Sequence, residues 1–254
     1  MKKEKTTESN RLYLIDAIRA LAIISMVAFH GFYDYLVFSG ANTRISQTGV
    51  FHIWEQTICW TFIFISGYCR AMGRKNLKRG ITVLVCAVII SVVTYFATPD
   101  DFINFGVLCF IGSAMLILIP FDKLFKKMNP FVGLIVFALL FFLTFDIPNG
   151  YIGYEGLKIC KMPDFLYANY LTAYLGFPHP QFTSGDYFPV IPWINLFVCG
   201  YFTQIIIDTK CPKFKEILKF KVPILSQIGR YSLLIYMAHQ PILYGAFVLI
   251  YKFF

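Results

Sequence analysis

Residues 80–97 read GITVLVCAVIISVVTYFA, a run in which no side chain is charged. A bilayer core is about 30 Å thick, so a helix needs about 20 apolar residues to cross it. The basic residues Arg74, Lys75, Lys78 and Arg79 stand just before this run. A long apolar segment flanked by positive charge is typical of a transmembrane helix.

Six further segments share this character. The seven predicted spans are 12–36, 53–72, 80–97, 102–120, 130–146, 187–207 and 229–251. Five are almost free of charge, whereas the first two also contain polar residues. We therefore predict an all-α fold, a polytopic membrane helix bundle of about seven transmembrane helices.

The composition agrees with a membrane protein. Of the 254 residues, 57% are hydrophobic and 15% are charged, whereas a soluble domain has about 25% charged residues. The mean hydropathy is +0.63. These values exclude a disordered chain and an ordinary DNA-binding domain, and they argue against a soluble globular enzyme.

The net charge of +9 is explained by topology. With the N-terminus in the cytoplasm and seven spans, 19 of the 23 basic residues lie on the cytoplasmic side. Cytoplasmic loops are rich in Lys and Arg. We therefore predict a cytoplasmic N-terminus and a C-terminus outside, in a multi-pass protein of the cell membrane, and no nucleic-acid partner.

Residues 147–186 form the one long connection, which this topology places outside. Glycine and proline are frequent in it, so turns are expected. Its stretch 164–177 is aromatic and weakly charged, which suggests a short helix in the outer interface. We predict that residues 1–254 form a single integral membrane domain with this loop.

The first span carries most of the ionisable side chains, and such residues at membrane depth mark functional candidates. Asp16 and Arg19 are three residues apart, and His30 and Asp34 are four apart, so each pair shares a helix face. Arg19 and His30 are eleven residues apart, which is about three turns or about 16 Å along the axis. One polar stripe is predicted, with a basic inner end.

This stripe suits a ligand with a charged head and a long reactive arm, as in an acyl-coenzyme A. Arg19 would bind the phosphates at the inner surface, and the thioester would reach His30. A neutral His30 could remove a proton from an acceptor hydroxyl or amine, and Asp34 could orient its ring. The simpler interpretation is that Arg19 anchors the helix to the membrane boundary and that His30 is a packed residue.

His239 lies ten residues beyond the inner end of the last span, at a depth similar to His30. Pro241 follows it and deprives the carbonyl group of Met237 of a helix hydrogen bond. His239 could therefore line the reaction cavity with His30. Alternatively, it forms a structural hydrogen bond between helices.

The second span ends in Ser66-Gly67-Tyr68-Cys69-Arg70, and Arg74 follows. Small residues let helices approach closely. Arg70, Arg74 and Ser66 are candidates for donor binding. Such a basic cluster also enforces topology and binds anionic lipid.

Trp193 and Asp101 are candidates for binding the acceptor, since an outer tryptophan could stack on a sugar. Aromatic residues at this depth are also ordinary interfacial anchors. The seven cysteines form no CxxC spacing, so neither a metal site nor a disulfide framework is predicted.

Five segments, in order, resemble the catalytic domain of the heparan-alpha-glucosaminide N-acetyltransferase family and its small bacterial relatives. They are 15–23 with Phe29-His30, 62–67, 104–108, 186–189 with Pro192-Trp193, and 229–230 through His239-Gln240-Pro241. The resemblance implies a cytoplasmic acyl-CoA donor and a glycan-like acceptor outside. It also implies a catalytic role for His30 and a donor-binding role for Arg19.

The sequence thus predicts a membrane-embedded acyltransferase. It would move an acyl group, with acetyl-CoA as the expected donor, to a hydroxyl or amine of an outer-facing glycan or glycolipid. This is glycan modification at the cell envelope. Besides acyl-CoA and the glycan, membrane lipid is a predicted partner, and a homodimer is left open.

The alternative function is a proton- or ion-coupled small-molecule transporter, because intramembrane ionisable residues also form proton relays. The sequence shows no inverted repeat that would favour it. A third alternative is a non-catalytic membrane scaffold. The polar stripe argues against it, because buried charges are costly and a scaffold does not need them.

Overall fold

The computed structural model describes residues 11–41 and 49–253. Lys2, Lys3, Lys5 and Arg44, which enter the predicted charge balance, lie outside the described residues. The chain divides into two compact units, one of Met1–Phe62 with Lys210–Phe254 and one of Ile63–Thr209. Helix α3 (Gly49–Met72) contributes to both units.

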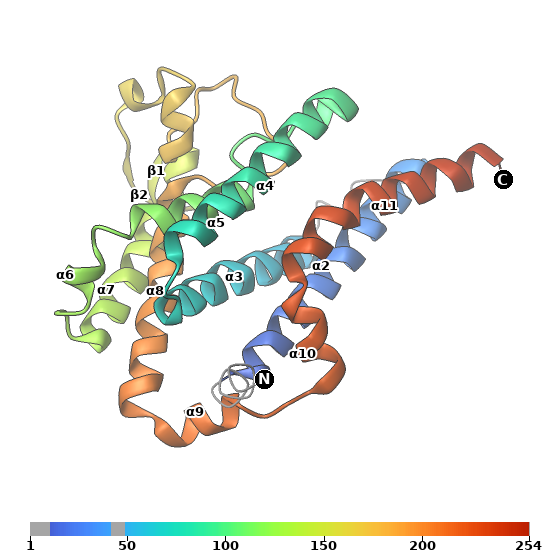
Figure 1. The fold of residues 1–254 in the computed structure, drawn as a ribbon. Coiled ribbons are helices and arrows are strands. Elements are labelled where there is room, and N and C mark those ends of the chain that lie inside the picture. Colours follow the sequence, from blue (N-terminus) through green and yellow to red (C-terminus); the bar gives the residue numbers. More distant parts are fainter. Residues whose placement is uncertain (1–10, 42–48, 254) are drawn as a thin grey trace. The chain divides into compact units, whose positions relative to one another are not determined.

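The first unit is built around α2 (Tyr13–Phe38), which contacts α9 (Pro212–Leu218), α10 (Pro223–Arg230) and α11 (Ser232–Phe253). Figure 1 shows α2 and α11 running side by side. Helices from the first and last parts of the sequence therefore pack against each other in this unit. The approach of α10 to α2 is close, because a Cβ added at Gly229 would lie 1.8 Å from the Asp16 carbonyl oxygen.

The core of the first unit centres on Ile23, Met26 and Ile58. These residues come from α2 and from the first part of α3. Trp54 of α3 donates a hydrogen bond from Nε1 to Ser25 Oγ over 2.7 Å. Apolar packing and this bond together join the start of α3 to α2.

The second unit contains the rest of α3, α4 (Asn76–Ala97), α5 (Val107–Ile117), α6 (Asp122–Phe125), α7 (Pro130–Thr144) and α8 (Val190–Lys210). Of the span of α8, 67% is buried, against 11% of the span of α4. Helix α8 is therefore central in this unit. Its residues Phe197 and Phe202 are fully buried among aromatic neighbours such as Phe110 and Phe125.

Two glycines let the backbones of α3 and α8 touch. A Cβ added at Gly67 would lie 1.8 Å from Phe197 O, and one at Gly200 would lie 2.0 Å from Phe64 O. Real Cβ atoms are not found at such distances. Because each helix contributes one glycine, the contact is reciprocal, and any side chain at either position would force the helices apart.

Helices α4 and α5 interlock in a similar way, and Figure 1 shows them side by side. A Cβ added at Gly80 would lie 2.6 Å from the Leu116 side chain, and one at Gly112 would lie 2.7 Å from Leu84. Each glycine receives a leucine of the other helix. Such packing of small against large residues is common where apolar helices meet in a membrane.

The predicted fourth span, 102–120, is helical only from Val107 to Ile117. These 11 residues extend about 16 Å, which is too short to cross a bilayer alone. The cause lies at the N-terminal side, where Phe105 has a φ of 58°. The segment before α5 is bonded to residues 184–188 rather than extended as helix.

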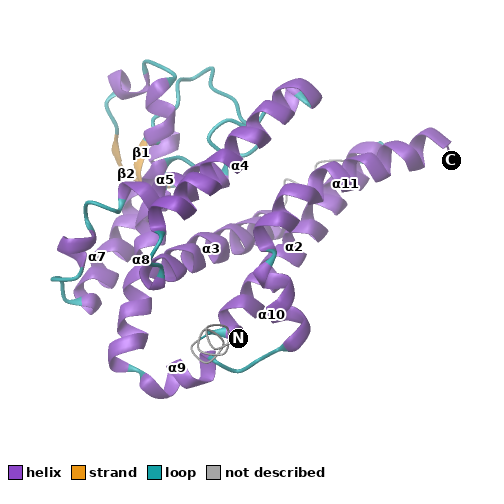
Figure 2. Ribbon diagram, in the orientation of Figure 1, coloured by secondary structure: helices purple, strands orange, loops and turns teal. Residues whose placement is uncertain are grey.

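The long connection 147–186 contains structure that sequence patterns did not predict. Strands β1 (Tyr151–Tyr154) and β2 (Leu157–Lys161) pair antiparallel, and Figure 2 shows them in orange among helices. Between them, Glu155 and Gly156 have φ values of 43° and 94°, as a two-residue hairpin turn requires. Asp146 anchors the hairpin by accepting a hydrogen bond from Gly156 N over 3.1 Å.

The short helix predicted for 164–177 is replaced by two 3₁₀ turns, Asp164–Tyr167 and Leu171–Leu175. Two further 3₁₀ turns, Pro99–Asp101 and Ile147–Asn149, follow α4 and α7. Tyr167 donates a hydrogen bond to Ile147 O over 2.5 Å, and burial raises the pKa of its phenol. The phenol therefore keeps its proton to a higher pH than an exposed tyrosine does.

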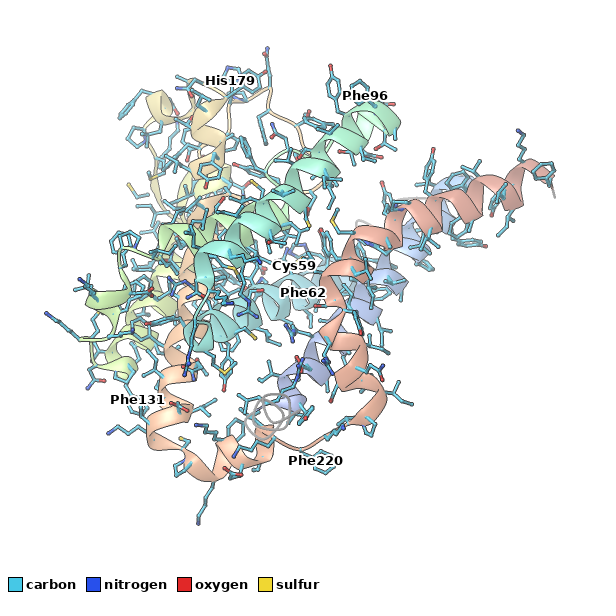
Figure 3. All side chains as sticks on the ribbon, viewed as in Figure 1. Cys59, Phe62, Phe96, Phe131, His179 and Phe220 are labelled. Carbon is cyan, nitrogen blue, oxygen red and sulfur yellow. The ribbon has the colours of Figure 1, made fainter. Side chains whose placement is uncertain are left out.

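The predicted all-α membrane bundle is confirmed. Among the described residues, five segments are long and apolar enough to cross a membrane: Tyr13–Phe38, Asn76–Ala97, Pro130–Asn149, which includes α7 and the 3₁₀ turn after it, Val190–Lys210 and Ser232–Phe253. Large apolar side chains lie on helix exteriors, such as Phe96 and Phe131, which are 78% and 48% exposed (Figure 3). Exposed apolar surface of this extent suits contact with lipid.

We predict that Gly67→Ala and Gly200→Ala each lower the free energy of unfolding by about 1–3 kcal/mol or more, because the added methyl group meets backbone. Thermal melts of the detergent-solubilised protein measure the effect. Gly245→Ala is the matched control, since a Cβ there meets nothing within 4 Å. Equal melting temperatures for all three variants would contradict a tight crossing.

Candidate functional site

Two histidines from opposite ends of the sequence meet between α2 and α11. The ring centroids of His30 and His239 are 5.0 Å apart, and the rings are tilted by 53°. His239 is only 9% exposed. The structure thus brings together the two histidines that the sequence predicted for the reaction site.

The tautomer of His239 follows from its hydrogen bond. His239 Nδ1 lies 2.6 Å from Tyr236 O. A carbonyl oxygen can only accept, so Nδ1 carries the proton, and in the neutral ring Nε2 keeps its lone pair. Nε2 is buried and has no hydrogen-bond partner within the described residues. His239 therefore presents an unused proton acceptor beside His30.

Asp34 lies one turn beyond His30, as predicted, and is 5% exposed. Its two carboxylate oxygens accept hydrogen bonds from Gln240 Nε2 over 3.1 and 3.2 Å. These bonds also orient the Gln240 amide, whose Oε1 is buried. The role of Asp34 in orienting His30 stays a prediction, whereas its contact with α11 is direct.

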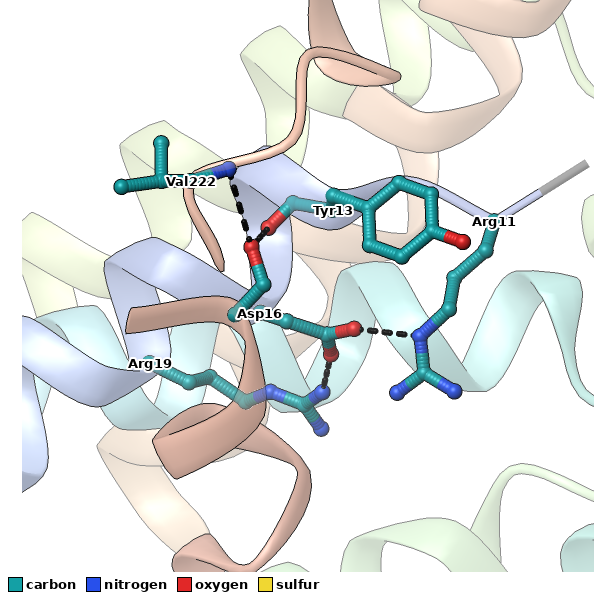
Figure 4. Close-up of polar contacts among 6 residues, drawn as sticks. Arg11, Tyr13, Asp16, Arg19 and Val222 are labelled. Carbon is teal, nitrogen blue, oxygen red and sulfur yellow. Dashed lines mark hydrogen bonds and ion pairs between the residues drawn. The ribbon is translucent and has the colours of Figure 1, made fainter. Parts of the chain in front are cut away.

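The N-terminal end of α2 and the residues just before it carry a cluster of charges, which Figure 4 shows. Asp16, 4% exposed, accepts from Arg11 Nε over 2.6 Å and from Arg19 Nη2. Nearby, Ser226 Oγ donates to Tyr13 O over 3.0 Å. One carboxylate thus pairs with two guanidinium groups, so the cluster of these three side chains keeps a net positive charge.

Arg70, in the second unit, is the most deeply buried charged residue described, at 1% exposed. Its Nη1 donates to Asp122 Oδ1 over 2.6 Å, and its guanidinium carbon lies 5.7 Å from the centre of the Tyr201 ring. The residue is therefore held by an ion pair and an aromatic face, whereas Arg74 is exposed and Ser66 half-buried in the same unit.

Trp193, the predicted sugar-binding residue, is 7% exposed and packs against Phe141, Phe145 and Phe188. Its packing role is plain from these contacts. Asp101 is exposed at the end of the 3₁₀ turn Pro99–Asp101. Binding of an acceptor by either residue stays a prediction.

The segments 104–108 and 186–189, both part of the sequence resemblance, bind one another. Asp186 Oδ2 accepts from Val107 N over 3.0 Å, which satisfies one of the free N–H groups at the start of α5. Phe188 N donates to Phe105 O over 2.9 Å. This motif pair therefore has a structural role, whatever else it does.

Within the described residues, no group of three or more His, Cys, Asp or Glu could hold a metal ion. Around the histidine pair, the first unit offers two imidazoles, the Asp34 carboxylate and the Gln240 amide. These residues define a class of site. It consists of a pair of membrane helices with a proton acceptor near the centre and cationic groups at one end.

Comparison with known families identifies the class further. Residues 11–241 match the family described as "Heparan-alpha-glucosaminide N-acetyltransferase, catalytic". The match covers most of the chain, so the chain belongs to this family of membrane acetyltransferases, and the sequence resemblance is confirmed. No curated protein and no solved structure matches the chain.

Sequence reasoning missed three partners of the predicted residues: Gln240, Asp122 and Arg11. Gln240 lies within the quoted motif next to His239, so a polar residue in an apolar span was an available signal. Asp122 is separated from Arg70 by 52 positions. No local pattern connects the two, and only the packed structure pairs them.

We predict that Asp122→Ala lowers the free energy of unfolding by about 3–5 kcal/mol, because it leaves the Arg70 charge buried without its partner. The control is Glu216→Ala, which breaks an exposed ion pair with Lys219 and should cost at most about 1 kcal/mol. Denaturation of both variants in the same detergent tests the difference. If the two losses were equal, the Arg70 ion pair would contribute no more than a surface pair.

Proposed function

We propose that the chain transfers an acyl group, acetyl in the first instance, from acyl-CoA at the cytoplasmic face to an outer-facing glycan or glycolipid. The acceptor atom is a hydroxyl oxygen or an amine nitrogen. Membership of an acetyltransferase family supports acyl transfer. The donor, the acceptor, the location in the cell membrane and the single-domain organisation are parts of this proposal.

The His30–His239 pair is the observation that carries the proposal. It lies inside two long apolar helices, where a polar group is costly unless it has a function. Helix α2 is unbroken from Tyr13 to Phe38. The predicted separation of about 16 Å between Arg19 and His30 therefore applies, and an extended pantetheine arm has comparable reach.

The proposed reaction needs one proton acceptor. A histidine ring nitrogen removes the proton from the acceptor hydroxyl or amine, and the freed electron pair attacks the thioester carbonyl carbon. The tetrahedral intermediate collapses, the C–S bond breaks, and the coenzyme A thiolate leaves and takes up the proton. His30 is our first candidate for this base, and His239 is the second because its Nε2 is unused. Asp34 supports the site through Gln240.

Each of the two units holds candidate residues for binding the donor. In the first unit we assign Arg19 to the phosphates. In the second unit Arg70, Arg74 and Ser66 are the candidates. A cationic side chain and a phosphate form hydrogen bonds that are shorter and stronger than neutral ones.

We predict that His30→Ala lowers turnover by about 100- to 10,000-fold, as loss of a general base does, and leaves donor affinity unchanged. Release of free coenzyme A from acetyl-CoA, with cell-envelope extract as acceptor, measures turnover. His239→Ala in the same assay shows which ring accepts the proton. Normal turnover by both variants would refute the assigned chemistry.

Arg19→Ala is expected to raise the Kd for acetyl-CoA by about 10- to 100-fold, since a charge-assisted hydrogen bond is lost. Arg11→Ala is the matched control, because it removes the other arginine that pairs with Asp16. Calorimetric titration of both variants tests the assignment. Equal weakening by both would point to the Asp16 cluster as a whole and against a specific role for Arg19.

A further inference from the structure

Arg70 uses only part of its hydrogen-bonding capacity. Nη1 is bound to Asp122, but Nε and Nη2 are buried and have no partner among residues 11–41 and 49–253. A buried donor of a charged group without a partner is costly. The side chain is 1% exposed, so bulk solvent does not relieve this cost.

The two unused atoms form one edge of the guanidinium group. Nε–H and the Nη2–H beside it point in parallel, with the spacing of two oxygens of a phosphate or carboxylate. Asp122 occupies a different nitrogen, Nη1. Arg70 is thus held in place by one group and presents a complete two-donor edge to another.

The local charge favours an anion at this edge. Positions 70–79 contain Arg70, Arg74, Lys75, Lys78 and Arg79 and no acidic residue. Arg79 lies close to the turn, because its Nη1 is 3.0 Å from the place of a Cβ at Gly73. Two carboxylates lie near this end of α3, those of Asp122, which pairs with Arg70, and of Asp208, which is close to Tyr68. The basic residues of the segment outnumber them.

We propose that the Nε/Nη2 edge of Arg70 is a buried oxyanion site that binds the phosphate group of a phosphate ester. Asp122 and Tyr201 position the guanidinium, and the edge binds two phosphate oxygens at once. The phosphate has two sources, the coenzyme A donor or an anionic lipid headgroup. The first source rests on the proposed function, whereas the oxyanion site itself does not.

Arg70→Lys is the test variant, because an ammonium group retains the charge near Asp122 but lacks the two-donor edge. The full chain is purified in neutral detergent, and the Kd is measured for coenzyme A and, separately, for short-chain phosphatidylglycerol. A short-chain diacylglycerol, which has no phosphate, is the lipid control. Arg230→Lys, which changes an exposed arginine of the first unit, is the matched protein control.

We expect Arg70→Lys to raise the Kd for coenzyme A by about 10- to 100-fold and Arg230→Lys to leave it unchanged. If only phosphatidylglycerol loses affinity, the phosphate belongs to a lipid and the oxyanion site still stands. Unchanged affinity for both ligands would overturn the proposal. If the wild-type protein fails to bind coenzyme A, the donor assignment is refuted. The oxyanion site is then tested by the effect of Arg70→Lys on the Kd for phosphatidylglycerol alone.

If Arg70→Lys does not fold, the double variant Arg70→Gln with Asp122→Asn takes its place. It removes both members of the ion pair, so no unpaired charge remains buried. The same two titrations apply. Retained affinity in this folded variant for both ligands also overturns the proposal.

Discussion

The cost of burying a charge without a partner governs where the polar side chains of this protein lie. Asp16 is 4% exposed and lies between two guanidinium groups, and Arg70, at 1%, is paired with Asp122. Asp34, also buried, receives two hydrogen bonds from Gln240. Each of these contacts connects separate elements or stabilises a helix end. Electrostatic pairing thus directs assembly as well as supplying candidate binding groups.

Backbone contact at glycine is the second requirement, and it gives the family motifs a physical meaning. Gly67 touches α8 and Gly229 touches α2, both at distances that admit no side chain. Asp186 caps the first turn of α5. A motif that resembles a catalytic signature in the sequence therefore includes residues whose direct role is to bring helices together. The catalytic candidates are the remaining polar members, above all His30 and His239.

The histidine pair shows how the fold could create reactivity from ordinary residues. A hydrogen bond to Tyr236 O, within the same helix, places the proton of His239 on Nδ1. The other ring nitrogen, Nε2, therefore keeps its lone pair. The neighbouring helix supplies the second ring. Two apolar spans thus hold two imidazoles together within a membrane domain whose family transfers acetyl groups. This arrangement supports the proposed proton transfer better than any other cluster described.

The amino-acid sequence by itself determined the membrane class, the family and the polar stripe of α2. These follow from composition and from the fixed geometry of a helix, which places residues three, four or eleven apart on one face. The sequence predicted seven spans, whereas five of the described helices are long and apolar enough to cross a membrane. Only the tertiary structure decided that Gln240 binds Asp34, that Asp122 binds Arg70, that Trp193 is packed and that α5 is short. Such partners are distant in the chain, and their meeting depends on how closely helices pack, which no local periodicity encodes.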